Sequence, residues 1–407
     1  MKTMKVLLIN SLYHPVRYGG AERSVQYLAE SLIDCGHDVV VTTLGPNKAD
    51  PVGVTGGVKV IRLPLRNLYW PFDDKPRPAP LPKLWSAIDA YNPAMERAVF
   101  DIIRRENPSI VHTNNLHGFS VAAWRAAKRN NKPVLHTLRD YYLVCGRSTR
   151  WRVGGICKAT CLPCRAFLAT RARCTPWVDG VVGNSQFILD LHRDLGCFVQ
   201  AKFRQAIHSP CPLAPHPRAF DIGVPRRKLI FGFLGRLQPI KGVDLLLRTF
   251  LQRSDNRWKL LIAGDGPPHY KNRLHALGKN SAHDDSIEFL GQTNADEFFE
   301  RIDILCAPSL WEEPLSRAVI EAAARGIPVI ASRRGGHPEV VDHGRTGLLF
   351  EPDEPRSLAK AIDLFFEQPE LIARLGAAAY IQAQARNPER IARQYDGLYQ
   401  SLVAAAT

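Results

Sequence analysis

Two basic residues five positions apart follow an apolar run in the second half of the chain. They are Arg236 and Lys241, which come directly after the run 229–234. An arginine presents a fork of donors and a lysine a compact charge, so the pair suits a diphosphate and the negative charge on a departing phosphate. A solvated basic loop is the alternative.

Two glutamates, Glu313 and Glu321, form a second candidate group. Pro314 is typical of a first helical position, so we expect a helix to begin there and to leave the backbone amides of Leu315 and Ser316 open to oxygens. On such a helix the carboxylates lie about 80° apart and face one wall of a cleft. A carboxylate accepts two hydroxyl hydrogen bonds, as a ribose or hexose diol requires. An acidic capping residue and a solvated helical glutamate are the alternative.

Three further turns contain glycine, which allows a ligand to approach the backbone closely. Gly335 with Gly336 and the segment 264–267 both follow apolar runs. The third turn contains Gly20 and precedes a helical pattern over 24–33, whose first amides could receive a phosphate. For Gly20 an ordinary turn is the alternative.

Short apolar runs that alternate with helical patterns must position these residues. Strands alternating with helices predict parallel sheets covered on both faces, and therefore two doubly wound, Rossmann-like α/β domains. Active sites of such sheets lie beyond the carboxyl ends of the strands, which predicts a site in a cleft between the domains. The expected strands are 5–10, 38–43, 58–63, 110–112, 133–138, 180–183, 229–235, 258–263, 286–290, 304–307, 328–332 and 347–350.

Two proline-rich segments interrupt the alternation. The segment 209–217 indicates the boundary between an N-terminal domain, 1–217, and a C-terminal domain, 218–407, with the last helix packing back on the N-terminal domain. Prolines also crowd together in 67–93, which we interpret as an irregular excursion. This excursion carries Trp70, Phe72 and Trp85.

Composition narrows the class of protein. The chain has 407 residues, of which 45% are hydrophobic and 23% charged, as in a soluble globular protein and unlike a disordered, fibrous or membrane-embedded one. No run approaches the roughly 18 apolar residues that span a bilayer. The apolar start is strand-like and does not resemble a signal peptide, so we expect a cytoplasmic protein.

Positive charge is confined to the first half of the chain. Residues 1–220 contain 30 Lys and Arg against 15 Asp and Glu, whereas residues 221–407 contain 24 of each. The N-terminal half is therefore expected to meet something acidic: a phosphorylated substrate, an anionic membrane surface or nucleic acid. A basic surface that serves only solubility is the alternative.

Four of the nine cysteines lie close together in the sequence. Their spacing, C-x11-C-x3-C-x2-C, ends in a pair typical of a zinc knuckle, so a structural zinc is one hypothesis. Reduced structural thiols are a second, and an iron–sulfur cluster or a disulfide arrangement is a third. The four residues are Cys145, Cys157, Cys161 and Cys164.

The cysteines belong to a strongly basic segment. Residues 139–177 contain eight Lys and Arg, one acidic residue and two tryptophans. We hypothesise that this insert binds a polyprenyl-diphosphate-linked acceptor at an anionic membrane surface, where each cation contributes about 1 kcal/mol. A nucleic-acid patch competes with this idea, but the chain contains no nucleic-acid-binding motif that we recognise, so we expect no nucleic acid partner.

Taken in order, these motifs resemble the family-4 retaining glycosyltransferases of GT-B fold, in which two Rossmann-like domains face a cleft. The resemblance covers nearly the whole chain and is most specific in the C-terminal half. Some members of that family carry cysteines after an equivalent Asp-Tyr. The motifs are Gly19-Gly20-Ala21-Glu22, Gly235-Arg236 with Lys241-Gly242, Gly264-Asp265-Gly266-Pro267, Glu313 with Glu321, and Gly335-Gly336-His337-Pro338-Glu339.

The resemblance implies a role for each matching residue. Arg236 and Lys241 would hold the diphosphate of a nucleotide-sugar donor, Glu321 its ribose and Glu313 its sugar. The amides of Leu315 and Ser316 would touch sugar hydroxyls or phosphate. Two further residues would complete the set: Thr293 beside the base, and Gly20 in contact with phosphate or acceptor.

One position departs from the family pattern. The family commonly has a histidine after the strand equivalent to 134–138, in contact with the donor sugar, but Arg139 stands there and His136 lies three positions earlier. Arg139 would then bind an acidic sugar or a phosphate, or pair with Asp140. The sequence leaves these alternatives open.

The resemblance also implies a mechanism. The configuration at the anomeric carbon would be retained, and the departing phosphate oxygen would take the proton of the acceptor hydroxyl. No Asp-x-Asp metal clamp occurs in the sequence, so no catalytic cofactor is expected. The acceptor would be a glycan or a lipid-linked glycan of polysaccharide or glycolipid synthesis. A GT-B nucleotide-sugar epimerase, a phosphorylase and a non-catalytic nucleotide-sugar binder are the alternatives.

Overall fold

The computed structural model describes residues 3–16, 19–45, 52–73, 75–152, 155–218, 228–279 and 284–406. The chain forms two compact units. The first unit contains residues 1–152, 157–210 and 388–407, and the second contains 153–156 and 211–387. The chain leaves the first unit after Pro210, whereas we placed the boundary at 217. It returns to the first unit with the last helix.

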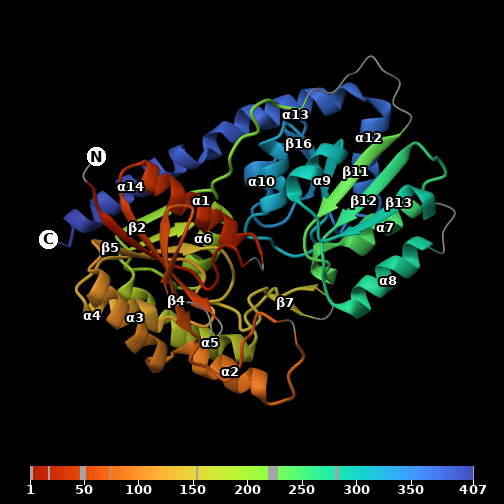
Figure 1. Ribbon diagram of the computed structural model, residues 1–407. Coiled ribbons are helices and arrows are strands. Elements are labelled where there is room, and N and C mark those ends of the chain that lie inside the picture. The colour runs from red at the N-terminus through yellow and green to blue at the C-terminus, as the bar shows by residue number, and fades with distance from the viewer. Residues whose placement is uncertain are drawn as a thin grey trace. The chain divides into compact units, whose positions relative to one another are not determined.

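The first unit is built on an eight-stranded sheet in the order β10-β9-β6-β5-β1-β2-β4-β3 (Figure 1). All neighbouring strands are parallel except β3 and β4, which are antiparallel. Every expected strand of this half is present, and β3 and β10 are additional. The strands are β1 (Lys5–Ile9), β2 (Asp38–Gly45), β3 (Val52–Thr55), β4 (Val58–Pro64), β5 (Ile110–Thr113), β6 (Val134–Leu138), β9 (Gly180–Gly183) and β10 (Phe203–Ala206). The short strand β7 (Trp151–Arg152) lies outside this sheet, and β8 (Gly155–Ile156) belongs to the second unit.

Helices cover both faces of this sheet (Figure 1). On one face, α1 and α14 bury Val25, Leu28 and Tyr399 against Val6 and Leu8 of β1. On the other face lie α3 and α4. The helices of this unit are α1 (Ala21–Asp34), α2 (Leu81–Ala90), α3 (Pro93–Glu106), α4 (Ala122–Arg129), α5 (Leu162–Ala172), η1 (Thr175–Trp177), α6 (Gln186–Asp194) and α14 (Pro388–Ala404).

Our interpretation of 67–93 as irregular was wrong for its second half, because α2 runs from Leu81 to Ala90. Pro82 lies in the first turn, where proline needs no hydrogen-bond donor. Trp85 and Asp89, four positions apart, are buried at 2% and 0% exposure. Burial of this one face in the tertiary structure favours the helix. In the sequence, the many prolines nearby made the four-residue spacing of Trp85 and Asp89 hard to recognise as helical.

The second unit contains a six-stranded, fully parallel sheet in the order β13-β12-β11-β14-β15-β16. Leu260 and Ile262 of β12 belong to the core on one face, and Leu261 and Ala263 to the core on the other. This period of two shows a strand buried on both sides. The strands, all expected, are β11 (Leu229–Leu234), β12 (Trp258–Ala263), β13 (Ile287–Gly291), β14 (Ile304–Ala307), β15 (Val329–Ser332) and β16 (Gly347–Phe350).

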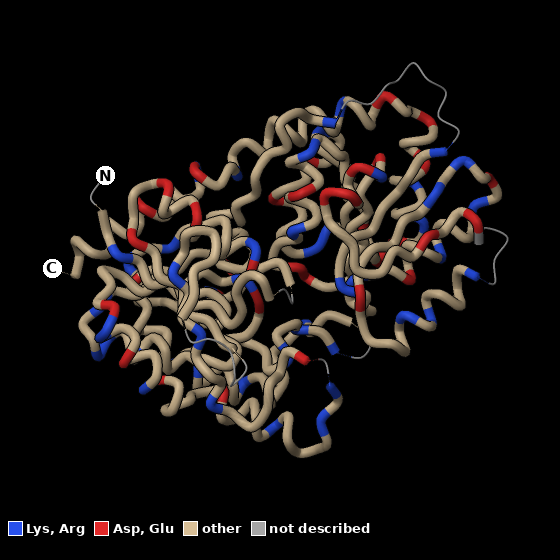
Figure 2. Tube along the Cα trace, viewed as in Figure 1, with Lys and Arg blue, Asp and Glu red and all other residues tan. Residues whose placement is uncertain are grey.

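Helices cover both faces of the second sheet as well. Leu246 and Leu247 of α7 pack in one core, whereas Phe298 of α9 and Val319 of α10 pack in the other. Figure 2 shows acidic and basic segments interspersed over this unit, in keeping with its balanced charge. Its helices are η2 (Pro239–Lys241), α7 (Val243–Leu251), α8 (Pro268–Lys279), η3 (Asp284–Ser286), α9 (Ala295–Arg301), α10 (Arg317–Ala323), α11 (His337–Val340), α12 (Ser357–Glu367), α13 (Glu370–Ala383) and η4 (Gln384–Arg386).

Both sheets have a topological switch point, where successive strands are added in opposite directions. In the first sheet it lies between β1 and β5, and in the second between β11 and β14. Loops at the carboxyl ends of the two strands diverge there, which is where open α/β sheets bind ligands. Among the helices that the structure describes, none is long and apolar enough to cross a membrane.

Candidate active site

The switch point of the second sheet brings two candidate loops together. The loop after β11 ends at Gly242 with φ +70°, and a Cβ there would lie 2.0 Å from the carbonyl oxygen of Pro308, in the loop after β14. The Leu310 amide donates to the Ile240 carbonyl at 2.8 Å. These two loops therefore pack backbone to backbone, and only glycine fits at position 242.

Lys241 and Glu313 meet at this junction. Lys241 Nζ lies 2.6 Å from Glu313 Oε1, and the Ser309 hydroxyl donates to Glu313 Oε2 at 2.6 Å. His337 Nε2 is 3.8 Å from the same Oε2. Both carboxylate oxygens are therefore engaged, and the lysine ammonium has a defined position.

Glu313 is ionised although it is only 7% exposed. Burial alone would raise its pKa, but the charge of Lys241, the neighbouring His337 and the two hydrogen bonds lower the pKa to about 2. Burial also lowers the pKa of His337, against the raising effect of Glu313. The site thus holds a fixed negative charge beside a cation. That arrangement can accept hydrogen bonds from hydroxyls and attract a phosphate.

The glycine pair at 335 and 336 packs against this same loop. A Cβ on Gly335, where φ is +53°, would lie 2.1 Å from the Glu313 carbonyl oxygen. The Gly336 amide donates to that oxygen at 2.8 Å, and the Gly335 amide donates to Glu312 Oε2 at 2.6 Å. We expected these glycines to let a ligand approach; the close approach that the structure shows is to the loop containing Glu313.

The predicted helix start at Pro314 was wrong. Helix α10 begins at Arg317, with Ser316 in the N-cap position, so Glu313 and Leu315 precede the helix. The 80° relation that we derived between the two glutamates therefore does not apply. The backbone is still extended at Ser316, where ψ is 120°, so the helix cannot begin before Arg317. The loop before it is held in this conformation by its hydrogen bonds with η2 and with the 335–336 turn.

Glu321 lies inside α10 and is 6% exposed. Its Oε1 accepts from Arg317 Nε at 2.9 Å, one helical turn earlier. Arg325 donates to the Glu321 backbone carbonyl at 2.9 Å. The Glu321 carboxylate is thus oriented by Arg317 of its own helix, whereas the Glu313 carboxylate is oriented by Lys241 and Ser309.

Arg236 lies in the first part of the loop after β11, half-buried. This part packs on the turn after β12: a Cβ on Gly264 would lie 1.8 Å from the Gly235 carbonyl oxygen, and the Leu237 amide donates to the Asp265 carbonyl at 2.8 Å. The pKa of Asp265 is lowered, first by a hydrogen bond from Lys271 and also by the charge of Arg236. Arg236 is therefore in electrostatic contact with the turn after β12.

The remaining predicted contacts lie on other loops. Thr293 is exposed between β13 and α9, next to Asn294, whose side chain caps α9. Gly20 is the N-cap of α1 in the first unit, and the neighbouring Gly19 amide donates to Glu22 Oε2 at 3.0 Å.

Arg139 follows β6 in the first unit. Its Nε donates to Asn114 Oδ1 at 2.9 Å, and its Nη1 to the Ser209 hydroxyl at 3.1 Å. The Asp140 carboxylate instead accepts from the Tyr142 amide at 2.8 Å. Arg139 thereby links the loops that follow β5 and β6.

The four clustered cysteines approach one another in the structure. Cys164 forms thiol hydrogen bonds with Cys145 and Cys161, and burial raises its pKa to about 12. Cys157 interacts electrostatically with Cys145 and Cys161. Even so, in the described ranges, which omit 153–154 beside these cysteines, no three potential ligands are arranged to hold a metal ion. The structural zinc therefore stays a prediction.

Sequence reasoning missed Ser309 and His337 as partners of Glu313. His337 stands in the quoted Gly-Gly-His-Pro-Glu motif after β15, whose neighbour in the sheet is β14. Adjacent parallel strands end at the same edge, and that signal could have placed His337 beside Glu313. Ser309 carries no comparable signal.

Two family models match the chain, one in each half. The sequence model of the family described as Glycosyl transferase 4-like domain matches residues 19–205, and that of Glycosyl transferases group 1 matches residues 218–382. A Klebsiella pneumoniae protein described as an uncharacterized 42.6 kDa protein in cps region is 35% identical over 338 residues, 83% of this chain and 87% of that protein. D-inositol 3-phosphate glycosyltransferase of Streptomyces scabiei is 33% identical over 176 residues, 40% of this chain and 39% of that enzyme.

Solved structures share the fold. Sucrose-phosphate synthase from Thermosynechococcus elongatus matches with a TM-score of 0.77 and 23% identity, and the match covers 99% of this chain and 100% of that chain. Anabaena HepE in complex with UDP-glucose matches with a TM-score of 0.73 and 20% identity, covering 98% and 100%.

The two Rossmann-like domains, each built on a parallel sheet, and these matches place the chain in the class of GT-B glycosyltransferases. Within it, the chain belongs to the glycosyltransferase family in which a glycosyl transferase 4-like domain is followed by a glycosyl transferases group 1 domain.

Proposed function

We propose that this glycosyltransferase moves a sugar from a nucleotide-diphosphate sugar to a glycan or a polyprenyl-diphosphate-linked acceptor, with retention of configuration. The observation that carries the proposal is the Lys241–Glu313–Ser309 network at the switch point of the second sheet. A fixed cation beside a fixed carboxylate matches a donor that offers phosphate oxygens next to sugar hydroxyls. The binding of UDP-glucose by the structurally similar HepE agrees with such a donor.

Each residue has a role in this proposal. Lys241 and Arg236 bind the diphosphate and stabilise the charge that grows on the departing phosphate oxygen. Glu313 accepts hydrogen bonds from sugar hydroxyls, and its low pKa keeps it ionised for that task. Glu321 binds the ribose diol. The other donor contacts are the amides of Leu315 and Ser316, Thr293 beside the base, Gly20 at a phosphate, and Arg139 at the sugar or at an acidic group on it.

Transfer then proceeds on one face of the sugar. The acceptor hydroxyl attacks the anomeric carbon, the bond to the diphosphate breaks, and the departing oxygen takes the hydroxyl proton. Electrostatic stabilisation of the leaving group supplies the main catalytic effect, as one such donor commonly accounts for about 10²–10³ in rate.

A nucleotide-sugar screen followed by two substitutions tests the proposal. UDP-, GDP- and ADP-sugars are compared by thermal shift, since a ligand that binds the folded state raises its stability. Glu313→Ala should abolish transfer and largely spare nucleotide binding, whereas Glu321→Ala should weaken binding. Unchanged turnover in Glu313→Ala would refute the assignment.

The same experiments separate the alternatives. An epimerase would isomerise or hydrolyse the donor without an acceptor. A non-catalytic binder would keep its nucleotide affinity and show no turnover in the unsubstituted protein.

We further propose that the protein works in polysaccharide or glycolipid synthesis at the cytoplasmic face of a membrane. The basic segment 139–177 supports association with anionic lipid, because most of its cations are exposed, among them Arg147, Arg165 and Arg173. Flotation with liposomes that contain or lack phosphatidylglycerol tests this. Equal flotation with both would remove the membrane hypothesis.

A further inference from the structure

The switch point of the first sheet is a second place where polar loops converge. The Ser11 hydroxyl, after β1, donates to the Asn115 carbonyl at 2.9 Å, and the Asn115 amide donates to Asn10 Oδ1 at 3.0 Å. Arg139 joins the loop after β6 to Asn114. Loops from three strands are thus tied together at the carboxyl edge, where ligands bind in folds of this kind.

His117 projects from the middle one of these loops and is held by aromatic rings. Its ring centroid lies 4.5 Å from that of Trp85 and 5.6 Å from that of Phe72, which meets it edge-on. Trp85 is itself fixed, because its indole N–H donates to the Tyr69 carbonyl at 2.9 Å. Yet 36% of the His117 side chain is exposed. The imidazole is therefore held by its neighbours and still open to a ligand.

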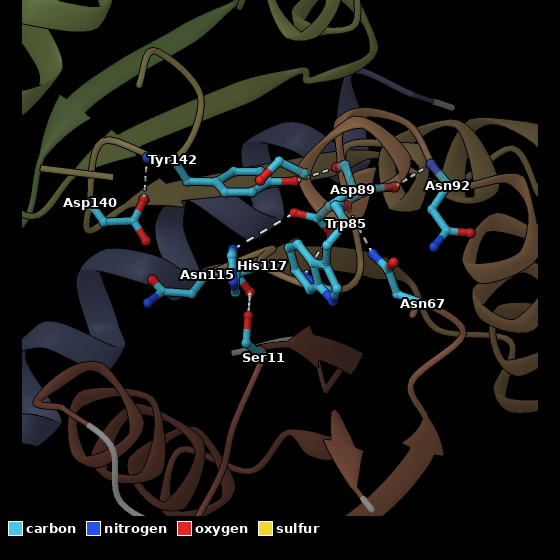
Figure 3. Close-up of polar contacts among 12 residues, drawn as sticks. Ser11, Asn67, Trp85, Asp89, Asn92, Asn115, His117, Asp140 and Tyr142 are labelled. Carbon is cyan, nitrogen blue, oxygen red and sulfur yellow. Dashed lines mark hydrogen bonds and ion pairs between the residues drawn. The ribbon is translucent and has the colours of Figure 1, made fainter. Parts of the chain in front are cut away.

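A buried carboxylate lies behind His117 (Figure 3). Asp89 is 0% exposed, and its Oδ1 accepts from the Gly118 amide at 2.8 Å. Its Oδ2 makes no hydrogen bond with any residue that the structure describes. That oxygen lies 3.7 Å from His117 Nδ1 and 3.8 Å from Arg171 Nη2. Burial raises the pKa of Asp89 to about 7, against the lowering charge of Arg171, so the carboxyl is ionised above pH 7. An ionised, buried Oδ2 without a donor is costly, and a small rotation of His117 that brings Nδ1–H onto it would then be favourable.

Helix α5, which begins directly after Cys161 and contains Cys164, places an arginine beside this carboxylate. Arg171 of α5 is 2% exposed, donates to the Tyr142 carbonyl, and places its guanidinium 3.8 Å from the centre of the Tyr142 ring. The Tyr142 hydroxyl in turn donates to the Asp89 carbonyl at 2.7 Å. The excursion that carries Trp85 and the cysteine-bearing insert therefore converge on Asp89.

We propose that His117, oriented by Asp89, is a positioning residue that binds a hydroxyl of the sugar acceptor. Because Nδ1 faces the buried carboxylate, Nε2 is the nitrogen available to a ligand, and it accepts the hydroxyl hydrogen. Phe72, which meets the imidazole edge-on, and Trp70, whose ring centroid lies 5.2 Å from that of Phe72, are both partly exposed and supply an apolar surface, the usual composition of a small-molecule site. This inference rests on the proposed transfer reaction and names the acceptor side of it.

The charge state of His117 agrees with an accepting role. Partial burial, and next the charge of Arg171, lower its pKa below the usual value, so the imidazole is neutral near pH 7. A neutral imidazole that donates from Nδ1 has an unprotonated Nε2. Retaining transfer by the departing oxygen needs no general base, so His117 orients the hydroxyl and takes no proton in the reaction.

Saturation-transfer NMR with methyl glycosides of glucose, galactose and mannose, in the presence of UDP, tests the proposal. His117→Ala should weaken glycoside binding about tenfold, the value of one good hydrogen bond, and leave UDP affinity unchanged. His117→Gln should restore part of the affinity, because an amide oxygen can accept the same hydrogen. The control is His269→Ala, an exposed histidine of α8 in the other unit.

The outcomes distinguish this inference from the proposed function. Equal glycoside binding by His117→Ala, or an equal loss of UDP and glycoside affinity, would overturn the role of His117 while leaving the donor site intact. Failure of every glycoside to bind the unsubstituted protein would overturn the assignment of a sugar to this site. Absence of binding by any nucleotide sugar would count against the proposed function instead. Asp89→Asn, checked for folding by circular dichroism, should weaken glycoside binding in the same way.

Discussion

Lys241 and Glu313 stand 72 positions apart in the sequence and form an ion pair of 2.6 Å at the switch point of the second sheet. The lysine follows β11 and the glutamate follows β14, two strands that are neighbours only because the sheet reverses its direction of growth between them. This strand order therefore brings two motifs that are distant in the sequence into direct contact through an ion pair.

Lys241→Ala should lower transfer about 10²–10³-fold, because it removes charge stabilisation from the departing diphosphate. It should also weaken nucleotide-sugar binding, measured by isothermal titration. Lys360→Ala, which removes an exposed lysine of α12, is the matched control and should change neither value. Equal activity of the two variants would contradict the role of Lys241.

Glu313 should contribute to stability in a pH-dependent way. Its pKa is about 2 in the folded protein and about 4.3 when unfolded, so its contribution is present above the unfolded value and is lost as pH falls between the two. The free energy of unfolding of wild type should therefore exceed that of Glu313→Gln at pH 7, and the difference should shrink by pH 3. Urea unfolding at several pH values measures it; a difference independent of pH would show that the carboxylate is not held as described.

Gly242→Ala should destabilise the second unit strongly. Alanine at positive φ costs about 1 kcal/mol, and here its Cβ would also lie 2.0 Å from the Pro308 carbonyl oxygen, so the loss should reach about 3 kcal/mol or more. Gly344→Ala is the matched control, because its φ of +77° is similar and a Cβ there meets nothing within 4 Å. Denaturant unfolding should separate the two variants, and equal losses would mean that the loops do not pack as described.

The zinc hypothesis predicts about one zinc ion for each purified chain, bound by four thiolates. Cys161→Ser or Cys164→Ser should abolish the metal content and lower the melting temperature, whereas Cys35→Ser, on the C-terminal end of α1, should change neither. Inductively coupled plasma mass spectrometry measures the ion. Purified protein without zinc would favour reduced structural thiols.

The strand and helix pattern could be predicted well from the sequence, because buried parallel strands are short apolar runs whose signal is local. Every predicted strand is present, and the doubly wound class follows from their alternation with helices. The prediction from local pattern was wrong at α2, because nearby prolines indicated irregular structure. Burial of Trp85 and Asp89 stabilises a helix there. The prediction was also wrong at Pro314, because tertiary contacts extend the loop before α10 as far as Ser316.

By itself the sequence determined which residue types were available for the site. It also determined that most of them follow strands, because the position of a strand can be predicted from a local run of apolar residues. Only the tertiary structure decided that Lys241 meets Glu313 and that Gly335 packs on the loop that contains Glu313. It also decided that Asp89, His117 and Arg171 converge. Strand order and loop packing set these contacts, and residues that are far apart in the chain carry no local signal of which strands become neighbours.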